Sequence, residues 1–424
     1  MNKIFMQKLI SLTTIVICLL FTFFNSPAIA GDESNARSVG MAHAFSSIAR
    51  GYHALKYNPA NLGISEDHSL DISVLEFGFM VENSSFGFND YSRYNDDIIS
   101  EDDKQKILSQ IPDKGLEINA IAEGSGLGFS LKNFAFLFSG EIASNITIPK
   151  DPFEMVLYGN YYKPNISDFS SRGEAWGIAD FAVGYGSEIR KWKENPIYAG
   201  ITFHYIRGFA YYEVMEAEGF LETQDTAIVA QGKASIRSST GGSGFSADLG
   251  IALELNDKYL FGLTLTNLIN NVSWTDDTEI TDYYFNLKPL NANIAEDESL
   301  FVSDDSSYTI GYFSKRRPTT LKLGVSSKYK KALWAAEYEQ GFENRPGSSA
   351  TPRLAAGLEF HSLNWLRLRT GFSMGGVSGF YYSLGCGLGS GAFRFDLGLA
   401  FEGFAFPTNS RGIRFSLSTY LNID

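Results

Sequence analysis

Residues 393–401 read Phe-Arg-Phe-Asp-Leu-Gly-Leu-Ala-Phe, with a large apolar side chain at most odd positions and a charged or small one at every even position. Side chains of a β-strand alternate between its two faces, so this stretch predicts a strand with one apolar and one polar face. Such an apolar face packs either against the core of a soluble protein or against lipid. The pattern in the rest of the chain bears on that choice.

The same alternation recurs through most of the second half of the chain. Residues 245–255, 353–361, 366–372, 380–388 and 413–421 repeat it. The apolar faces carry almost no charge and the polar faces carry both signs, as in a barrel with lipid outside and a polar lumen inside. We therefore predict an all-β protein, a transmembrane antiparallel β-barrel of about 14 strands over residues 69–424. A soluble β-sandwich stays open as the alternative, because its strands also alternate.

The first 30 residues have the three parts of a secretory signal peptide. Lys3 and Lys8 form a basic start, residues 9–24 are apolar, and Ala28-Ile29-Ala30 has the small-x-small form that precedes cleavage. The helix-breaking Asn25-Ser26-Pro27 follows the apolar run and argues against a signal-anchor helix. Residues 1–30 are therefore predicted to be a signal peptide that is cleaved after Ala30, and export together with the barrel pattern predicts a location in the cell outer membrane.

Composition excludes several classes of function. Loss of Lys3 and Lys8 with the signal takes the basic count from 35 to 33 against 48 acidic residues, a net charge of −15 that makes nucleic acid an improbable partner. Cys386 is the only cysteine left, and the five histidines lack metal-ligand spacing, so we predict no metal and no cofactor. The histidines show no local arrangement with serine and acidic residues of the kind that builds a catalytic triad, and we predict no enzyme activity.

The predicted connections are short or long. Residues 362–364 and 389–391 are tight turns, whereas residues 149–174 and the acidic stretch 271–306 are long connections. Short periplasmic turns and long outer loops are typical of outer-membrane barrels. Residues 101–111 predict a helix, with Ser100 as its N-cap and acidic residues in its first turn.

The stretch after the signal carries Gly40-Met41 among small residues and leads into Asn58-Pro59-Ala60. This order resembles the opening of the FadL/PorV superfamily of outer-membrane barrels, and residues 248–268, 367–372 and 395–401 resemble its middle and end. The chain departs from that pattern at Asn61, where glycine is usual, and in its non-aromatic C-terminus. The matching positions of the opening are Arg37, Gly40, Met41, Ala44, Phe45, Ala54, Tyr57, Asn58, Pro59, Ala60 and Leu62.

The resemblance implies that residues 31–68 form a hatch segment folded into the barrel mouth. Its motif would comprise Gly40, Met41, Asn58, Pro59 and Ala60. Asn58 and Pro59 also suit the start of a turn or helix, so a capped turn that anchors the first strand is the alternative interpretation. From the alternation, the charged residues predicted to face the lumen are Arg353, Glu359, Arg367, Arg369, Arg394, Asp396 and Arg414.

Two functions follow from the resemblance. The first is a FadL-like passive channel for small hydrophobic molecules. The alternative is a PorV-like barrel that binds or shuttles a secreted or surface protein, with aromatic anchors in the long connections. The expected partners are membrane lipid, a small hydrophobic ligand or a secreted protein, and the barrel-assembly machinery. The candidate anchors are Tyr161, Tyr162, Tyr283, Tyr284 and Phe285.

Overall fold

The computed structural model describes residues 32–64, 70–94, 99–159, 165–166, 169–224, 227–290, 301–376, 378–403 and 407–423. The predicted signal peptide and two of the candidate anchors, Tyr161 and Tyr162, lie outside these ranges.

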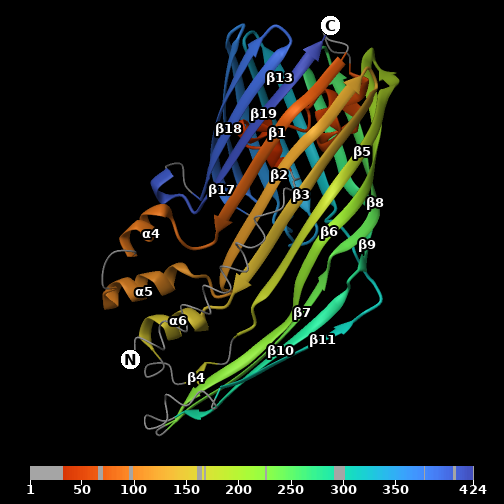
Figure 1. The fold of residues 1–424 in the computed structure, drawn as a ribbon. Coiled ribbons are helices and arrows are strands. Elements are labelled where there is room, and N and C mark those ends of the chain that lie inside the picture. Colours follow the sequence, from red (N-terminus) through yellow and green to blue (C-terminus); the bar gives the residue numbers. More distant parts are fainter. Residues whose placement is uncertain are drawn as a thin grey trace.

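Fourteen antiparallel strands close into a barrel, because the first strand pairs with both the second and the last. This confirms the predicted fold class. Figure 1 shows the strands as one tilted wall. In order around the wall they are β1 (Leu70–Asn83), β2 (Leu116–Leu131), β3 (Phe134–Ile148), β5 (Arg172–Trp192), β6 (Asn195–Thr223), β8 (Gly241–Leu255), β9 (Tyr259–Asp276), β13 (Thr320–Tyr329), β14 (Ala332–Gly341), β15 (Arg353–Leu363), β16 (Leu366–Gly375), β17 (Gly379–Ser390), β18 (Phe393–Glu402) and β19 (Gly412–Ile423).

The wall has an apolar outer face and a polar inner face. On β1, Phe77 and Val81 are exposed, whereas Glu76 and Glu82 are buried. An exposed apolar row in a closed barrel is stable where lipid replaces water, since apolar side chains then avoid water and every strand edge of the ring is paired. The period-two sequence pattern therefore reflects lipid on one side and the lumen on the other.

The two ends of the barrel differ in their connections. At the end that holds both Leu70 and Ile423, neighbouring strands join through short turns such as residues 364–365 and 391–392. At the opposite end the connections are long and carry helices α4 (Phe88–Tyr94), α5 (Glu101–Gln110) and α6 (Asp151–Tyr158) and the 3-10 helix η6 (Pro407–Asn409). Longer loops are typical of the extracellular side of such barrels, so we expect the helices on that side.

A sheet extends from the barrel at its long-loop end (Figure 1). The second half of β6 continues beyond the wall and pairs with β7 (Ile228–Ser239), which pairs with β10 (Glu279–Leu290), which pairs with β11 (Phe301–Thr309). Two short strands add to this region: β4 (Asn165–Ile166) pairs with β6, and β12 (Phe313–Lys315) pairs with β9. We call residues 211–223 of β6 together with β7, β10 and β11 the arm.

The arm changes one sequence-based expectation. Residues 271–306 were expected to form an acidic loop, but they contain the end of β9, all of β10 and the start of β11, with residues 291–300 outside the described part. The reason is that both faces of β10 and β11 mix polar and apolar side chains, so these strands lack the alternation that revealed the wall strands.

The predicted outer helix is confirmed as α5. Ser100 caps it by accepting a hydrogen bond from the Asp103 amide at 3.2 Å. The Ser100 hydroxyl donates to the Asp103 carboxylate at 2.6 Å, and this bond and nearby Arg93 hold the pKa of Asp103 below its usual value. None of the helices described has the length and apolar character needed to cross a membrane.

Candidate functional site

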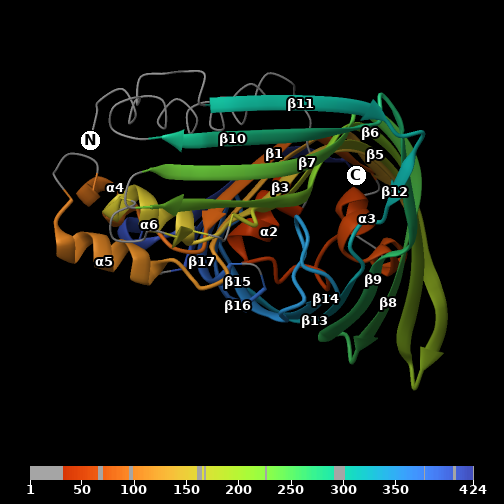
Figure 2. The same cartoon turned by 90° about the horizontal axis from the view of Figure 1, so that it is seen from below.

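The N-terminal segment lies inside the barrel (Figure 2). Its short helices are η2 (Asp32–Ser34), α2 (Ala36–Gly40), η3 (Gly51–His53), α3 (Ala54–Tyr57) and η4 (Pro59–Gly63). Helix α2 packs against β17, β18 and β19, η3 against β1 and β2, and η4 against β5, β6 and β8. The segment therefore follows the inner wall around most of its circumference, and nearly all of its residues are buried.

Asn58 begins η4 and also ties it to the wall. Its side-chain oxygen accepts from the Ala60 amide at 3.1 Å, and its side-chain nitrogen donates to the Ile251 carbonyl at 3.1 Å. Pro59 occupies the first turn, where its missing N–H costs nothing. The wall is shaped to admit this turn, since a Cβ on Gly200 would lie 2.3 Å from the Pro59 carbonyl carbon.

Gly40 and Met41 lie against the opposite side of the wall. A Cβ on Gly40 would approach the Gly385 Cα to 3.0 Å, and one on Gly357 would approach the Met41 carbonyl oxygen to 2.6 Å. Met41 is fully buried in a cluster with Phe45 and other residues of the segment. The backbone of the N-terminal segment thus contacts the backbone of the wall at positions where glycines leave space for it.

Charged wall residues hold the segment through its side chains and amides. Arg37 donates to both carboxylate oxygens of Glu359, at 2.8 and 2.9 Å. Glu337 accepts from the amides of Phe45 and Ser46 at 3.1 and 2.7 Å. Ion pairs of Glu33 with Arg414 and of Lys56 with Glu123 also join the segment to the wall, and His53 Nε2 lies 2.6 Å from the Glu76 carboxylate.

Some of the predicted lumen residues form one buried network. Arg369 donates to Glu359 at 2.6 Å and to Asp396 at 2.5 Å, and the Tyr420 hydroxyl donates to Asp396 at 3.0 Å. Since Glu359 also binds Arg37, this network reaches from four wall strands, β15, β16, β18 and β19, to the N-terminal segment.

The other predicted residues lie apart from this network. Arg353 pairs with Glu339 at 2.6 Å and donates to the Ala42 carbonyl at 3.1 Å, and Arg414 pairs with Glu402. Arg394 donates to carbonyls of its own turn, at Gly391 and Phe393. Arg367 is half-buried and stands opposite His361 in the ladder.

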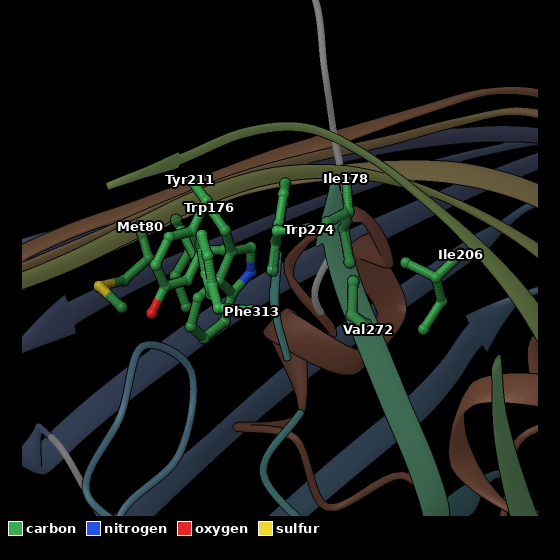
Figure 3. Close-up of a cluster of buried hydrophobic side chains, with 10 residues drawn as sticks. Met80, Trp176, Ile178, Ile206, Tyr211, Val272, Trp274 and Phe313 are labelled. Carbon is green, nitrogen blue, oxygen red and sulfur yellow. The ribbon is translucent and has the colours of Figure 1, made fainter. Parts of the chain in front are cut away.

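An apolar cluster fills the lumen near its outer end (Figure 3). Trp176 on β5, Tyr211 on β6, Trp274 on β9 and Phe313 on β12 are its aromatic members. The Tyr211 ring lies 5.1 Å from both the Trp274 and Phe313 rings, and the latter two stack with an interplanar angle of 20°. An aromatic cluster on the inner face of a barrel can bind an apolar molecule that enters from outside.

Cations surround this cluster. Arg237 lies 4.4 Å from the centre of the Phe313 ring, Arg345 lies 5.4 Å from the Trp176 ring and Lys315 lies 5.9 Å from the Tyr211 ring. A small cavity of about 20 Å³ remains between the rings and Arg316 and Arg317. The buried Trp274 Nε1 has no hydrogen-bond partner among the described residues.

A larger polar cavity of about 150 Å³ lies beneath the cluster. Trp176 and Arg317 line both cavities, and Lys56 of the N-terminal segment lines the larger one. On its wall His204 bridges Asp180 at 3.0 Å and Asp248 at 3.3 Å. The lumen therefore leads from an aromatic outer region through a charged chamber to the N-terminal segment.

Sequence reasoning missed both the cluster and the chamber. Asp248 was placed on an inward face, but nothing in the sequence links it with Asp180 or His204. The four aromatic residues come from segments far apart in the sequence, and the strand order β5, β6, β8, β9, β12 brings them near one another. An inward tryptophan interrupting a polar face, as at Trp176 and Trp274, was the available signal.

The DUF5723 family, described as a family of unknown function, matches residues 59–400. The chain belongs to this family. No curated protein matches it.

Several solved structures share the fold. The deltaS2S3 mutant of TodX, a monoaromatic hydrocarbon channel, is 13% identical with a TM-score of 0.54 over 92% of this chain and 99% of that chain. The toluene transporter TbuX of Ralstonia pickettii is 10% identical with a TM-score of 0.51 over 91% and 98%. The monoaromatic hydrocarbon channel CymD is 10% identical with a TM-score of 0.50 over 93% and 99%.

These likenesses agree with the predicted barrel fold. At such low identity they show the fold and not the substrate. The reported structures are transport proteins and lend no support to the secreted-protein alternative.

Proposed function

We propose that this protein is a passive outer-membrane channel for small hydrophobic molecules, with residues 32–64 acting as a hatch. The observation that carries the proposal is the aromatic cluster inside the lumen. Aromatic rings that face the lumen and leave a small cavity between them offer an apolar molecule a surface on which it is shielded from water. The structures that share the fold conduct such molecules, which supports this function over others.

The hatch proposal rests on the position of the segment. Asn58 and Pro59 are held in a glycine-lined part of the wall, and Arg37 and Lys56 are paired with buried wall carboxylates. Passage through the lumen would require these contacts to loosen locally. Ion pairs and hydrogen bonds suit this role because they are exchangeable with water, whereas a continuous apolar plug would not release.

Uptake of a hydrophobic dye by intact cells tests the channel. N-phenylnaphthylamine fluoresces when it reaches the apolar interior of the membrane, and we expect cells that produce the protein to take it up several-fold faster than cells without it. The variant Trp176→Ala/Trp274→Ala should lose most of this gain. The matched control Trp192→Ala/Trp365→Ala removes two tryptophans exposed at the opposite end and should retain it. Equal uptake by both variants would contradict the proposal.

A further inference from the structure

The outermost strand of the arm has a free edge. Strand β11 pairs with β10 from Phe301 to Thr309, and none of the described strands pairs with its other side. Residues 302–309 are all exposed. A strand edge of this kind offers a row of backbone N–H and C=O groups to which another extended chain can add.

The side chains beside this edge are acidic and aromatic. Asp305 stands opposite Tyr283 of β10, and Asp304 stands opposite Tyr284. Successive residues of a strand point to opposite faces, so each face of the sheet carries one carboxylate next to one tyrosine. Tyr283 and Tyr284 are 47% and 37% exposed, and their rings are accessible.

These charges select the kind of chain that can add. A second copy of β11, paired antiparallel about its middle residue Asp305, would place Asp305 directly opposite its own equivalent, and like charges directly opposed destabilise a strand pair. The segment 291–300 of this chain carries Glu296, Asp297 and Glu298 and is repelled in the same way. Basic side chains are favoured instead, through ion pairs with the aspartates and contact with the tyrosine faces.

We propose that β11 is a docking edge for an extended segment of another protein that carries two consecutive basic residues. One basic side chain would lie beside Asp305 on one face and the next beside Asp304 on the other. Neighbouring strands are about 5 Å apart, so a long arginine side chain can also reach the tyrosine on its face. This interaction is independent of transport through the lumen and would recruit a partner to the cell surface.

A peptide probe tests the proposal with the full-length protein in detergent micelles. We would label the peptide Thr-Val-Thr-Arg-Arg-Val-Thr-Val with fluorescein and measure its binding by anisotropy, with Glu-Glu in place of Arg-Arg as the control peptide. The Arg-Arg peptide is expected to bind roughly tenfold more tightly. Amide hydrogen exchange of residues 302–309 should slow when it binds, because strand addition pairs their backbone groups.

Two matched variants separate docking from general attraction to an acidic protein. Asp304→Lys/Asp305→Lys should weaken binding of the Arg-Arg peptide roughly tenfold. Glu101→Lys/Asp102→Lys makes the same change of charge on exposed residues of α5 and should leave binding unchanged. Heat-modifiable gel mobility checks that both variants fold.

Four results would overturn the proposal. They are equal weakening by both variants, no weakening by either, unaltered hydrogen exchange in β11, and binding of the arm to lipopolysaccharide vesicles but not to the peptide. The last result would assign the arm to the membrane surface instead of a protein partner.

Discussion

Arg37 of the N-terminal segment and Glu359 of β15 form a two-point contact, in which Nε and Nη2 of Arg37 donate to the two carboxylate oxygens at 2.8 and 2.9 Å. The Glu359 side chain is fully buried and also accepts from Arg369 at 2.6 Å. A single carboxylate thus joins the segment to the charge network of the wall, so stability and closure of the lumen depend on the same residue.

The substitution Glu359→Gln should destabilise the barrel. It leaves two guanidinium groups beside a neutral amide, and loss of one partner from a buried ion pair costs about 3–5 kcal/mol. The temperature at which the folded form disappears on a gel should fall. Asp103→Asn removes an exposed partner of Arg93 on α5 and serves as the control, with little change expected. Equal changes of the unfolding temperature in the two variants would show that the buried network adds nothing to the stability of the barrel.

Reversing the charge of Asp396 should have a similar effect. Asp396 lies between Arg369 and Tyr420, and Asp396→Lys would place a second cation beside the buried guanidinium. We expect a lower unfolding temperature in the same assay. Asp113→Lys, on an exposed residue of the β1–β2 connection, is the control. An unchanged unfolding temperature for Asp396→Lys would mean that the wall charges are solvated individually.

Filling the space under η4 should open the lumen. A Cβ at residue 200 would lie 2.3 Å from Pro59, so Gly200→Ala cannot accommodate the turn where it now lies. We expect a folded barrel that admits arabinose faster in a liposome-swelling assay. Gly126→Ala, where a Cβ meets no atom within 4 Å, should behave as the parent protein. Unchanged permeability of a folded Gly200→Ala variant would count against the hatch.

The lipid-facing surface can be tested on β15. Leu358 is 43% exposed on the outer wall beside the buried Glu359, and an arginine facing lipid costs about 2–4 kcal/mol at the membrane midplane. Leu358→Arg should therefore reduce the yield of folded barrel in lipid vesicles. Val156→Arg makes a similar change on α6, outside the barrel, and should fold normally. Equal yields would place Leu358 away from lipid.

The sequence predicted the wall because each wall strand separates lipid from the lumen. Residues 393–401 show this directly: Phe393 is 45% exposed on the outer face, whereas Asp396 is buried on the inner face. The pattern is local, because every second residue of a wall strand contacts lipid whichever strands it pairs with. The recurrence of this local pattern along the second half of the chain was therefore enough to indicate the fold.

The contents of the lumen could not be predicted in the same way. Trp176 and Phe313 are 137 positions apart in the sequence and belong to one cluster because the strand order of the wall brings β5, β6, β9 and β12 near one another. The polar inner faces of different strands also have similar sequences. The sequence therefore does not show that Arg369 pairs with Glu359 and Asp396, whereas Arg394 bonds to carbonyls of its own turn. The arm was missed because its strands are solvated on both faces and carry no period-two signal.

Tryptophan emission tests the central claim, that hydrophobic molecules bind within the lumen. In a Trp192→Phe/Trp334→Phe/Trp365→Phe background only Trp176 and Trp274 emit, and both belong to the buried cluster. We predict saturable quenching by 4-bromotoluene, which is lost when Phe313→Asp makes the cluster polar. Quenching that rises linearly with dissolved 4-bromotoluene, and equally in the Phe313→Asp variant, would contradict a binding site in the lumen.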